Sequence, residues 1–263
     1  MRRLLSLFIS VIVMVALTGC TGSSNEEKDQ LARIQEAGKI VIGTEGTWAP
    51  WTYHDTTGKL TGYDVEVMRA IAEKLGVEAE FKEGCWDGLL QGVGTRFDLI
   101  ANGVDVTEER QGAYDFTIPY AYNRTVLVVA EGNDEIKDFT DLKGKVAANS
   151  IGSTYELLAT EYGATTEGVE NLADCMQMLM DGRIDFFLNS ESSVQDYFLE
   201  RPDATVKIVN KTEDALSIAF PLPKGDDSKT LREAINKAIQ ELAEDGTLTR
   251  LSEQFFHGSD ISK

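Results

Sequence analysis

The sequence predicts an α/β protein of two lobes, each built on a mostly parallel sheet with flanking helices. Short runs of apolar and β-branched residues alternate along the chain with segments whose apolar residues recur at helical spacing. Strands that alternate with helices favour parallel sheets. The alternation forms two series of about a hundred residues each, before and after Tyr120, and each series is long enough to bury its own core. Two lobes fit this organisation better than one barrel.

The individual elements follow from periodicity and from turn residues. Residues 64–75 repeat apolar side chains at helical spacing, and Gly76 supplies a stop signal. In the first series we expect strands at 39–43, 80–81 and 99–101, a hairpin at 53–60, and helices at 64–75 and 86–93. In the second we expect strands at 126–130, 146–148, 184–188, 206–209 and 216–220, and helices from Ser153 or Thr154 to about 162, at 172–180, at 231–243 and at 248–256.

The N-terminus has the anatomy of an export signal. Arg2 and Arg3 precede an apolar run at 4–17, which is too short for a stable membrane span. The ending Leu17-Thr-Gly-Cys20 resembles a bacterial lipobox, in which the cysteine is lipidated and becomes the new N-terminus; an ordinary signal peptide with a chance cysteine is the alternative. We expect a lipoprotein signal peptide at 1–19, lipidation of Cys20, and a tether at 20–35 that holds the protein outside the cytoplasm on the bacterial cell membrane.

Composition excludes several classes of function. The formal net charge is −19, and removal of Arg2 and Arg3 with the signal peptide would make it −19 − 2 = −21, which argues against nucleic-acid binding. His54 and His257 are isolated, and no cluster has metal-ligand spacing, so we expect no metal and no cofactor. Cys85 and Cys175 could form a disulfide in an exported protein, but two buried free thiols are the favoured interpretation.

The stretch at 98–120 predicts a pocket for a carboxylate. A short buried strand ends there at Asn102-Gly103, a pair that favours a sharp turn. Asp105 and Thr107 then introduce a helix with an acidic first turn. Arg110 lies in that same turn, where a cation opposes the helix dipole, so helix stability does not explain it. A carboxylate bound by the planar guanidinium near the strand end would explain it.

Six blocks of sequence carry a resemblance to a known family. They are EGTWAPW at 45–51, GKLTGYDVE at 58–66, WDG at 86–88, TEER at 107–110, DFTIPY at 115–120 and DLKGK at 141–145. In order and spacing, from about Ile40 to Phe256, the chain resembles the extracytoplasmic solute-binding proteins of polar amino-acid ABC importers (family 3), and most of all their cystine-binding group. The resemblance implies a periplasmic-binding-protein fold, in which two crossing strands join the lobes and the ligand is trapped in the cleft. It places lobe one at 36–124 with 221–263, and lobe two at 125–220.

The resemblance also implies how the ligand's α-carboxylate is held. Arg110 corresponds to the family's carboxylate-binding arginine, and its planar fork suits that group. The turn at Ser153-Thr154 corresponds to the contribution of the second lobe, where backbone N–H groups at a helix start favour an anion. A surface ion pair of Arg110 with Glu109 or Asp115, and a plain helix cap at Ser153, are the alternatives.

The α-ammonium of the ligand is the point where this chain departs from the family. The family normally supplies an aspartate at the position that Ser190 occupies here. A hydroxyl cannot neutralise an ammonium in a closed cleft. We therefore expect Asp105 to replace the aspartate, with the neighbouring Glu191 as the alternative, unless the ligand lacks the usual ammonium.

Three tryptophans are expected to form the walls of the cleft. Trp48, Trp51 and Trp86 fall in blocks that line the cleft in the family, and Trp51 is the one most suited to core packing instead. Aromatic faces suit a cationic or polarisable ligand, and Glu45 lies where some relatives place an acid for a basic side chain. The full set of expected ligand-binding residues is Glu45, Trp48, Trp51, Trp86, Asn102, Gly103, Asp105, Arg110, Ser153, Thr154, Ser190 and Glu191.

The resemblance implies a lipid-anchored monomer that captures a polar amino acid, cystine or similar, by lobe closure and delivers it to the permease subunits of an ABC transporter. A dehydratase of the cyclohexadienyl type on the same scaffold is the alternative, with Ser190 and Glu191 marking a site diverted to acid catalysis. No nucleophile elbow or P-loop supports an enzyme. A sensory domain is a third option, disfavoured because nothing attached to the second lobe would carry a signal.

Overall fold

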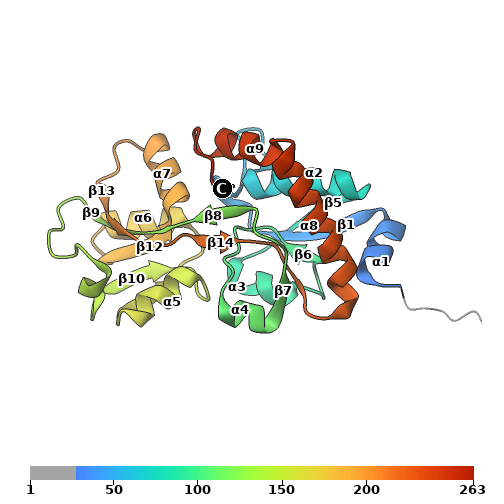
Figure 1. Cartoon of the computed structure of the whole chain (residues 1–263). Coiled ribbons are helices and arrows are strands. Elements are labelled where there is room, and N and C mark those ends of the chain that lie inside the picture. Colours follow the sequence, from blue (N-terminus) through green and yellow to red (C-terminus); the bar gives the residue numbers. More distant parts are fainter. Residues whose placement is uncertain (1–27) are drawn as a thin grey trace, which may run out of the picture.

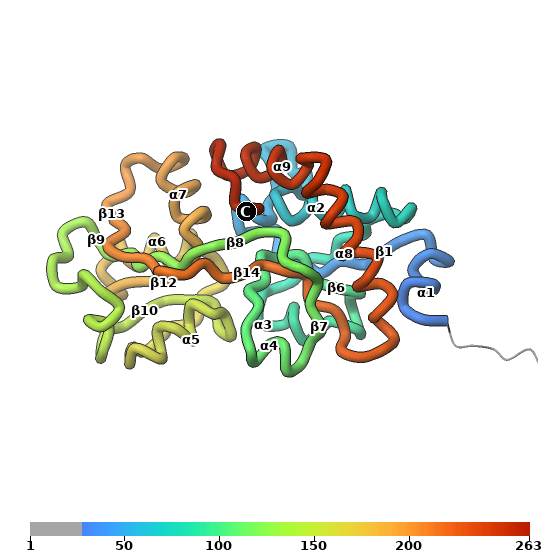
Figure 2. The backbone as a smooth tube through the Cα atoms, viewed as in Figure 1, coloured from blue at the N-terminus to red at the C-terminus, as the bar shows by residue number. Residues whose placement is uncertain are grey.

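The structure is a computed structural model that describes residues 28–263 (Figure 1). The predicted signal peptide, Cys20 and the first half of the predicted tether, residues 20–27, lie outside these residues. Figures 1 and 2 show two groups of strands flanked by helices, joined by a pair of extended segments. This confirms the two-lobed α/β fold that the alternation of strands and helices predicts.

Lobe one is built around a short parallel sheet. Its elements before the crossing are α1 (Gln30–Ala37), β1 (Lys39–Thr44), β2 (Thr47–Trp48), β3 (Thr52–His54), β4 (Leu60–Thr61), α2 (Tyr63–Leu75), β5 (Glu78–Glu83), α3 (Trp86–Leu89), the 3-10 helix η1 (Leu90–Gly92), β6 (Leu99–Ile100), α4 (Glu108–Ala113) and β7 (Tyr114–Phe116). The sheet has the order β5-β1-β6, with both pairings parallel. Ile40 and Ile42 of β1 pack against Met68 and Ile71 of α2 in one apolar cluster. The predicted helix at 86–93 is shorter, because η1 replaces its second half.

Lobe two is built around a mixed sheet of five strands. Its elements are β9 (Thr125–Ala130), η2 (Phe139–Leu142), β10 (Val146–Asn149), α5 (Thr154–Glu161), β11 (Thr165–Gly168), α6 (Leu172–Met180), β12 (Phe186–Ser190), α7 (Glu191–Glu200) and β13 (Val206–Lys211). The strand order is β11-β10-β12-β9-β13. Val126 and Val128 of β9 face one apolar cluster, and Leu127 and Val129 face the other, so both faces of the sheet are covered.

The expectation of a mostly parallel sheet is wrong for lobe two. β10 pairs in parallel with β11 and β12, but β9 pairs antiparallel with both β12 and β13. The reason is that β9 enters the lobe directly from the crossing segment. No helix intervenes to reverse the chain, so β9 does not have the direction that a strand–helix–strand unit would impose.

One antiparallel pair of strands forms the crossing between the lobes, and a second pair lies next to it in lobe one. β8 (Ala121–Asn123) pairs with β14 (Leu216–Ile218), and β15 (Pro221–Pro223) pairs with β7. The predicted lobe boundaries at Arg124 and Pro221 fall just after β8 and at the start of β15. The chain then forms η3 (Asp226–Ser228), α8 (Lys229–Glu244) and α9 (Thr247–Phe255), and both helices pack with α2 in lobe one, as Figure 1 shows.

Part of the predicted tether is a helix packed on lobe one. Asp29 accepts a hydrogen bond from the backbone N–H of Ala32 and starts α1, which buries Ile34. Arg33 forms an ion pair with Asp227 at 2.6 Å. The tether predicted at 20–35 therefore cannot extend beyond Asp29. The edge strand β11 and the helix α7 were also not expected, because the exposed TTEG sequence of β11 and the polar start of α7 have little apolar periodicity.

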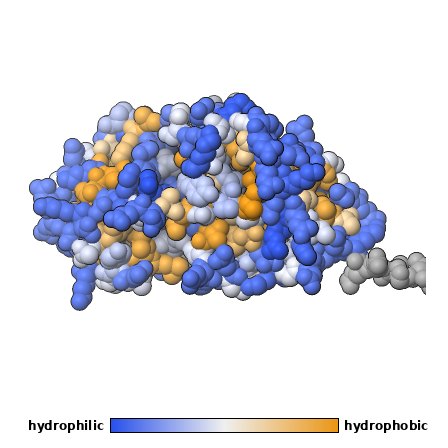
Figure 3. Space-filling model, viewed as in Figure 1, coloured by the Kyte–Doolittle hydropathy of each residue, from blue (hydrophilic) through white to orange (hydrophobic). Residues whose placement is uncertain are grey.

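The surface is consistent with the acidic composition. One face of the molecule is mostly hydrophilic, with apolar residues in small patches (Figure 3).

None of the helices within residues 28–263 combines the length and the apolar character that a membrane span requires.

Candidate functional site

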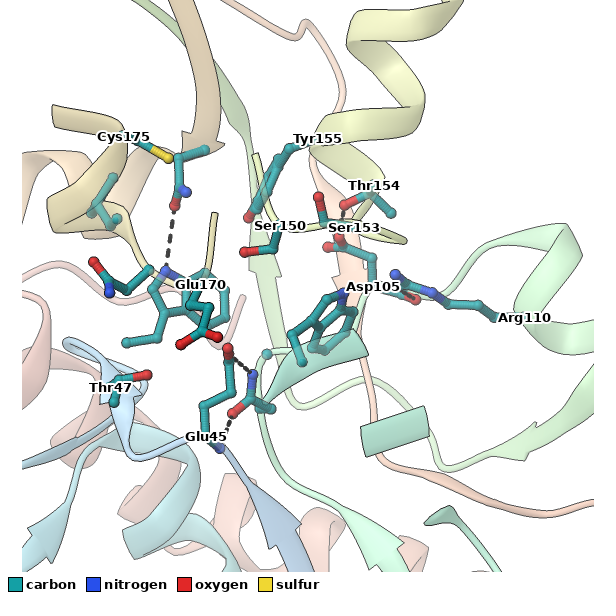
Figure 4. Close-up of a pocket in the computed structure, with 17 residues that line it drawn as sticks. Glu45, Thr47, Asp105, Arg110, Ser150, Ser153, Thr154, Tyr155, Glu170 and Cys175 are labelled. Carbon is teal, nitrogen blue, oxygen red and sulfur yellow. Dashed lines mark hydrogen bonds between the residues drawn. The ribbon is translucent and has the colours of Figure 1, made fainter. Parts of the chain in front are cut away.

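A pocket lies between the two lobes, and nine of the twelve expected residues line it (Figure 4). Its empty volume is about 550 Å³, including space that is open to solvent. From lobe one the lining residues are Glu45, Thr47, Trp48, Trp86, Asn102, Gly103, Asp105 and Arg110; from lobe two they are Ser150, Ser153, Thr154, Tyr155, Glu170, Asn171, Leu172, Cys175 and Asn189. The carboxyl ends of β1, β6 and β10 all open onto this pocket, which is where ligands bind in open α/β sheets.

Arg110 is held in the pocket by its helix and by backbone carbonyl groups. Thr107 caps α4 by accepting a hydrogen bond from the Arg110 backbone N–H at 3.2 Å, as predicted. The guanidinium donates to the Asp105 carbonyl at 3.0 Å and to the Gly152 carbonyl of lobe two at 3.3 Å. It also lies over the Trp86 ring, 5.3 Å from its centroid. Burial lowers the pKa of Arg110 from its very high ordinary value.

The alternative of a surface ion pair does not describe Arg110. Its exposure is only 7%, and within residues 28–263 it forms no ion pair. Asp115, one of the suggested partners, pairs with Arg232 at 3.2 Å instead. Three of the five guanidinium N–H donors have no protein acceptor in this part of the chain, so the fork is available to a ligand.

Asp105 connects the two lobes at the same end of the pocket. Its buried carboxylate accepts a hydrogen bond from the Thr154 hydroxyl of lobe two. Burial raises the pKa of Asp105, while the Thr154 hydrogen bond and the charge of Arg110 oppose that rise. Ser153 caps α5 by accepting from the Glu156 N–H at 3.1 Å, so the helix start faces the pocket beside Arg110.

Glu45 is fixed by a reciprocal pair of hydrogen bonds with Asn102. The Asn102 amide donates to Glu45 Oε2 at 2.5 Å, and its Oδ1 accepts from the Glu45 backbone N–H at 2.8 Å. Burial raises the pKa of Glu45 to about 7, and the Asn102 hydrogen bond opposes part of that rise. The side chain is therefore held in one position at the end of β1, with Oε1 free of hydrogen bonds from residues 28–263.

Position 103 requires a glycine, because its backbone lies against the rings of Trp48 and Trp51. Its φ is +55°, in the left-handed region, and a Cβ there would come within 2.7 Å of Trp48 Cζ3. Its backbone N–H donates to the fully buried Asp64 carboxylate at 2.5 Å. The turn after β6 is therefore held by a hydrogen bond to Asp64 of α2 and by packing against the Trp48 ring.

Trp48 lines the pocket, but Trp51 does not. The two rings stack with centroids 5.7 Å apart, and Trp51 is completely buried against Tyr63 and Phe256 in the core of lobe one. The expectation that Trp51 contacts the ligand is therefore wrong. Trp48 lies between it and the pocket.

Ser190 and Glu191 also lie outside the pocket lining. Ser190 is fully buried, caps α7, and donates to Asn123 Oδ1 at 3.0 Å. Glu191 forms an ion pair with Lys211 at 2.9 Å. Because β12 ends at Ser190 and α7 starts directly after it, both side chains are directed into the hinge region. Asp105 is the only one of the two proposed replacements for the missing aspartate that lines the pocket.

Several lining residues were missed by sequence reasoning. Asn189 immediately precedes Ser190 in β12. The expected ligand-binding position therefore differs by one residue from the position that lines the pocket. Glu170 and Asn171 follow the unpredicted strand β11, so no signal marked them. Cys175 is buried on α6, where its thiol donates to the Ala148 carbonyl at 3.4 Å and burial raises its pKa to about 12.

The two cysteines of the described residues lie in different environments. Cys175 is a buried free thiol as expected, but Cys85 is a free thiol on the surface, since it lies in the loop before α3. Within the described part of the chain, no group of three His, Cys, Asp or Glu side chains is placed to hold a metal ion.

The lobes are in direct contact at the pocket and next to it. The indole N–H of Trp48 donates to Asn189 Oδ1 at 3.3 Å, and that of Trp51 donates to Ser190 Oγ at 3.4 Å. On the hinge side, His257 Nε2 lies 2.8 Å from Asp196 Oδ1 of α7. With the Asp105–Thr154 and Arg110–Gly152 contacts, these interactions define a closed arrangement of the lobes.

A two-lobed fold that closes over a polar pocket is that of a solute-binding protein, and the chain belongs to the bacterial extracellular solute-binding proteins, family 3, which it matches over residues 40–258. It is 41% identical over 271 residues to the L-cystine-binding protein TcyA of Bacillus subtilis, covering 100% of this chain and 99% of the relative. An ancestral arginine-binding protein bound to arginine is 36% identical, with a TM-score of 0.78 over 83% of this chain and 98% of that one.

A third comparison concerns the open state. The L-cystine solute receptor of Neisseria gonorrhoeae, in its unliganded open conformation, is 44% identical, with a TM-score of 0.58 over 88% of this chain and 98% of that one. It has the higher identity but the lower TM-score of the two structures. This is expected when closed lobes are compared with open ones, because a hinge rotation moves one lobe as a rigid body.

Membership of the family also decides between a binding protein and an enzyme. The family is one of solute-binding proteins, and the relatives above are named for what they bind. The chain is therefore a binding protein and not a dehydratase. This agrees with Glu191, the residue suggested for acid catalysis, which is paired with Lys211 away from the pocket.

Proposed function

We propose that this protein captures L-cystine, or a similar polar amino acid, between its lobes and delivers it to the membrane permease of an ABC transporter. The observation that carries the proposal is the arrangement at one end of the pocket. Arg110 of lobe one and the start of α5 in lobe two face the same space, with Asp105 between them. A guanidinium with a helix start suits an α-carboxylate, and a buried carboxylate suits an α-ammonium.

In this proposal, Asp105 has the role that an aspartate at position 190 has in the family. Asp105 is buried beside the Thr154 hydroxyl, and an ammonium placed there would favour its ionised form. Trp48 and Trp86 would cover the apolar part of the ligand. The names of the relatives in Bacillus subtilis and Neisseria gonorrhoeae support cystine as the ligand.

A thermal-shift screen of amino acids, with L-cystine included and reductant excluded, followed by calorimetry, tests the proposal. The protein should bind its ligand with a Kd of about 1 μM or below, about −8 kcal/mol. Arg110→Ala should abolish that binding, while Arg96→Ala, which removes an exposed arginine of the same lobe outside the pocket, should leave it unchanged. Micromolar binding that survives Arg110→Ala would contradict the proposal.

We also propose that the protein is a lipoprotein anchored through Cys20, which the Leu17-Thr-Gly-Cys20 pattern supports. Mass spectrometry of the N-terminal peptide from membranes should find Cys20 as the first residue, carrying lipid. Cys20→Ala should release the protein from the membrane fraction or leave it unprocessed. A mature chain that begins elsewhere and stays soluble would contradict the anchor.

A further inference from the structure

The pocket has a second polar end, remote from Arg110. Figure 4 shows Glu45 and Glu170 on one side of the pocket, and Asp105, Thr154 and Arg110 on the other. The first group combines lobe one and lobe two, as the second group does. A ligand that spans the pocket therefore meets carboxylates at the end opposite its own α-carboxylate.

The charges that line the pocket do not balance. Three carboxylates and one guanidinium line it. Arg110 and Asp105 together match the carboxylate and ammonium of one amino-acid head group, which leaves Glu45 and Glu170 uncompensated. Within residues 28–263, neither of these glutamates forms an ion pair. A ligand with a single zwitterionic head would leave this negative charge facing its remote end.

The two glutamates differ in how they are held. Glu45 is half-buried and is fixed by Asn102, so its position is set before the ligand arrives. Glu170 is exposed at the pocket mouth and follows β11 in lobe two, so it approaches the ligand only as the lobes close. Solvent weakens its charge, so its effect on affinity is modest and depends on closure.

We propose that Glu170 is a specificity-determining residue that, together with Glu45, selects amino acids with a second ammonium group at the end remote from the α-carboxylate. This inference rests on the proposed function and narrows it to a ligand class. L-cystine belongs to the class, because each half of the molecule carries an ammonium group. Amino acids whose remote end lacks an ammonium group are disfavoured, since they leave Glu45 and Glu170 unpaired or oppose them with a like charge alone.

Two mixed disulfides separate this inference from general amino-acid binding. The disulfide of L-cysteine with cysteamine keeps the remote ammonium of L-cystine and lacks its remote carboxylate. The disulfide of L-cysteine with β-mercaptopropionate keeps the remote carboxylate and lacks the ammonium. By calorimetry, L-cystine and the cysteamine disulfide should bind at least about tenfold more tightly than the β-mercaptopropionate disulfide, because only they form a charge-assisted hydrogen bond at that end.

Substitution of Glu170 tests the residue itself. Glu170→Gln should reduce that preference by about threefold to fivefold, the effect of one exposed charge. Glu167→Gln is the matched control, since it removes the same charge from an exposed position of β11 outside the pocket lining, and it should leave the preference unchanged.

The outcomes distinguish the inference from the proposed function. If wild-type protein binds none of the disulfides and no free amino acid, the proposed function fails and the inference fails with it. If all three disulfides bind equally well, or if Glu170→Gln weakens all three by the same factor, the inference alone is overturned. In that last case Glu170 would support closure without selecting the ligand.

Discussion

Asp64→Asn should stabilise the ligand-free protein, and the gain should grow with pH. Asp64 lies in the first turn of α2, fully buried, with Oδ2 accepting from the Gly103 N–H at 2.5 Å. Its Oδ1 has no hydrogen-bond partner within the described residues. Burial raises the pKa of Asp64 to about 7, and the Gly103 N–H and the nearby Tyr120 hydroxyl oppose part of that rise. An asparagine keeps the acceptor for Gly103 and has no charge to bury.

The magnitude follows from linkage between protonation and folding. The pKa of an aspartate in the unfolded chain is about 3.9. Between about pH 4 and pH 7, the folded protein keeps a proton on Asp64 that the unfolded chain has released, so stability falls as pH rises. The loss is about 1.4 kcal/mol per pH unit, or roughly 4 kcal/mol in total, and it is constant above about pH 7. Asp64→Asn removes this loss.

Urea unfolding of both proteins from pH 4 to pH 8 measures the effect. The difference in free energy of unfolding between variant and wild type should rise with pH in favour of Asp64→Asn and level off above about pH 7. Glu73→Gln, on the exposed face of the same helix, controls for the loss of one negative charge. A difference that stays constant across the series would refute the assignment of a raised pKa to Asp64.

Three further predictions concern the site. Asp105→Ser should weaken ligands that carry an α-ammonium by at least about tenfold in calorimetry, because the ammonium loses its buried partner; unchanged affinity would exclude Asp105 from that role. Ser190→Ala removes the acceptor of Trp51 Nε1 and so favours the open lobes; it should weaken all ligands by one common factor of about twofold to fivefold, whereas a purely structural role would lower Tm and leave affinity unchanged. Affinity for ligands with a second ammonium should fall as pH drops below about 7, because Glu45 then holds a proton that it must lose to pair with the ligand. Glu45→Gln should abolish this fall. The other charged groups of the pocket, Glu170, Asp105 and Arg110, are unchanged in this variant.

The sequence predicts the lobes and the Arg110 end of the site well, since both depend on local signals. The apolar run of β1, the helical spacing of α2 and the capping Thr107 each act within a few residues. The mixed sheet of lobe two depends instead on the direction of β9. That direction is set by the crossing segment, from which the chain enters the lobe. Periodicity within one strand carries no information about the direction of its neighbours.

The errors at the site have a related origin. Trp51 and Trp48 lie three residues apart in one aromatic block, and only the packing of Tyr63 and Phe256 decides which ring is buried. Ser190 was expected in the pocket by its place in the chain, but the start of α7 directs it into the hinge. Glu170 follows an edge strand that has almost no apolar residues. For Trp51 the deciding contacts come from distant parts of the chain, whereas Ser190 and Glu170 depend on elements that the apolar pattern does not reveal.

The position of the Cys175 thiol has a consequence for the proposed function, in which the ligand is a disulfide. Exchange between thiols and disulfides requires the thiolate, and a thiol in the pocket wall could capture cystine as a mixed disulfide. With a pKa of about 12, Cys175 is in the thiolate form in only about one molecule in 10⁵ at neutral pH. Its thiol proton is also directed to the Ala148 carbonyl. Burial thus keeps this thiol unreactive, so that L-cystine, the proposed ligand, would not exchange its disulfide with the wall of the pocket.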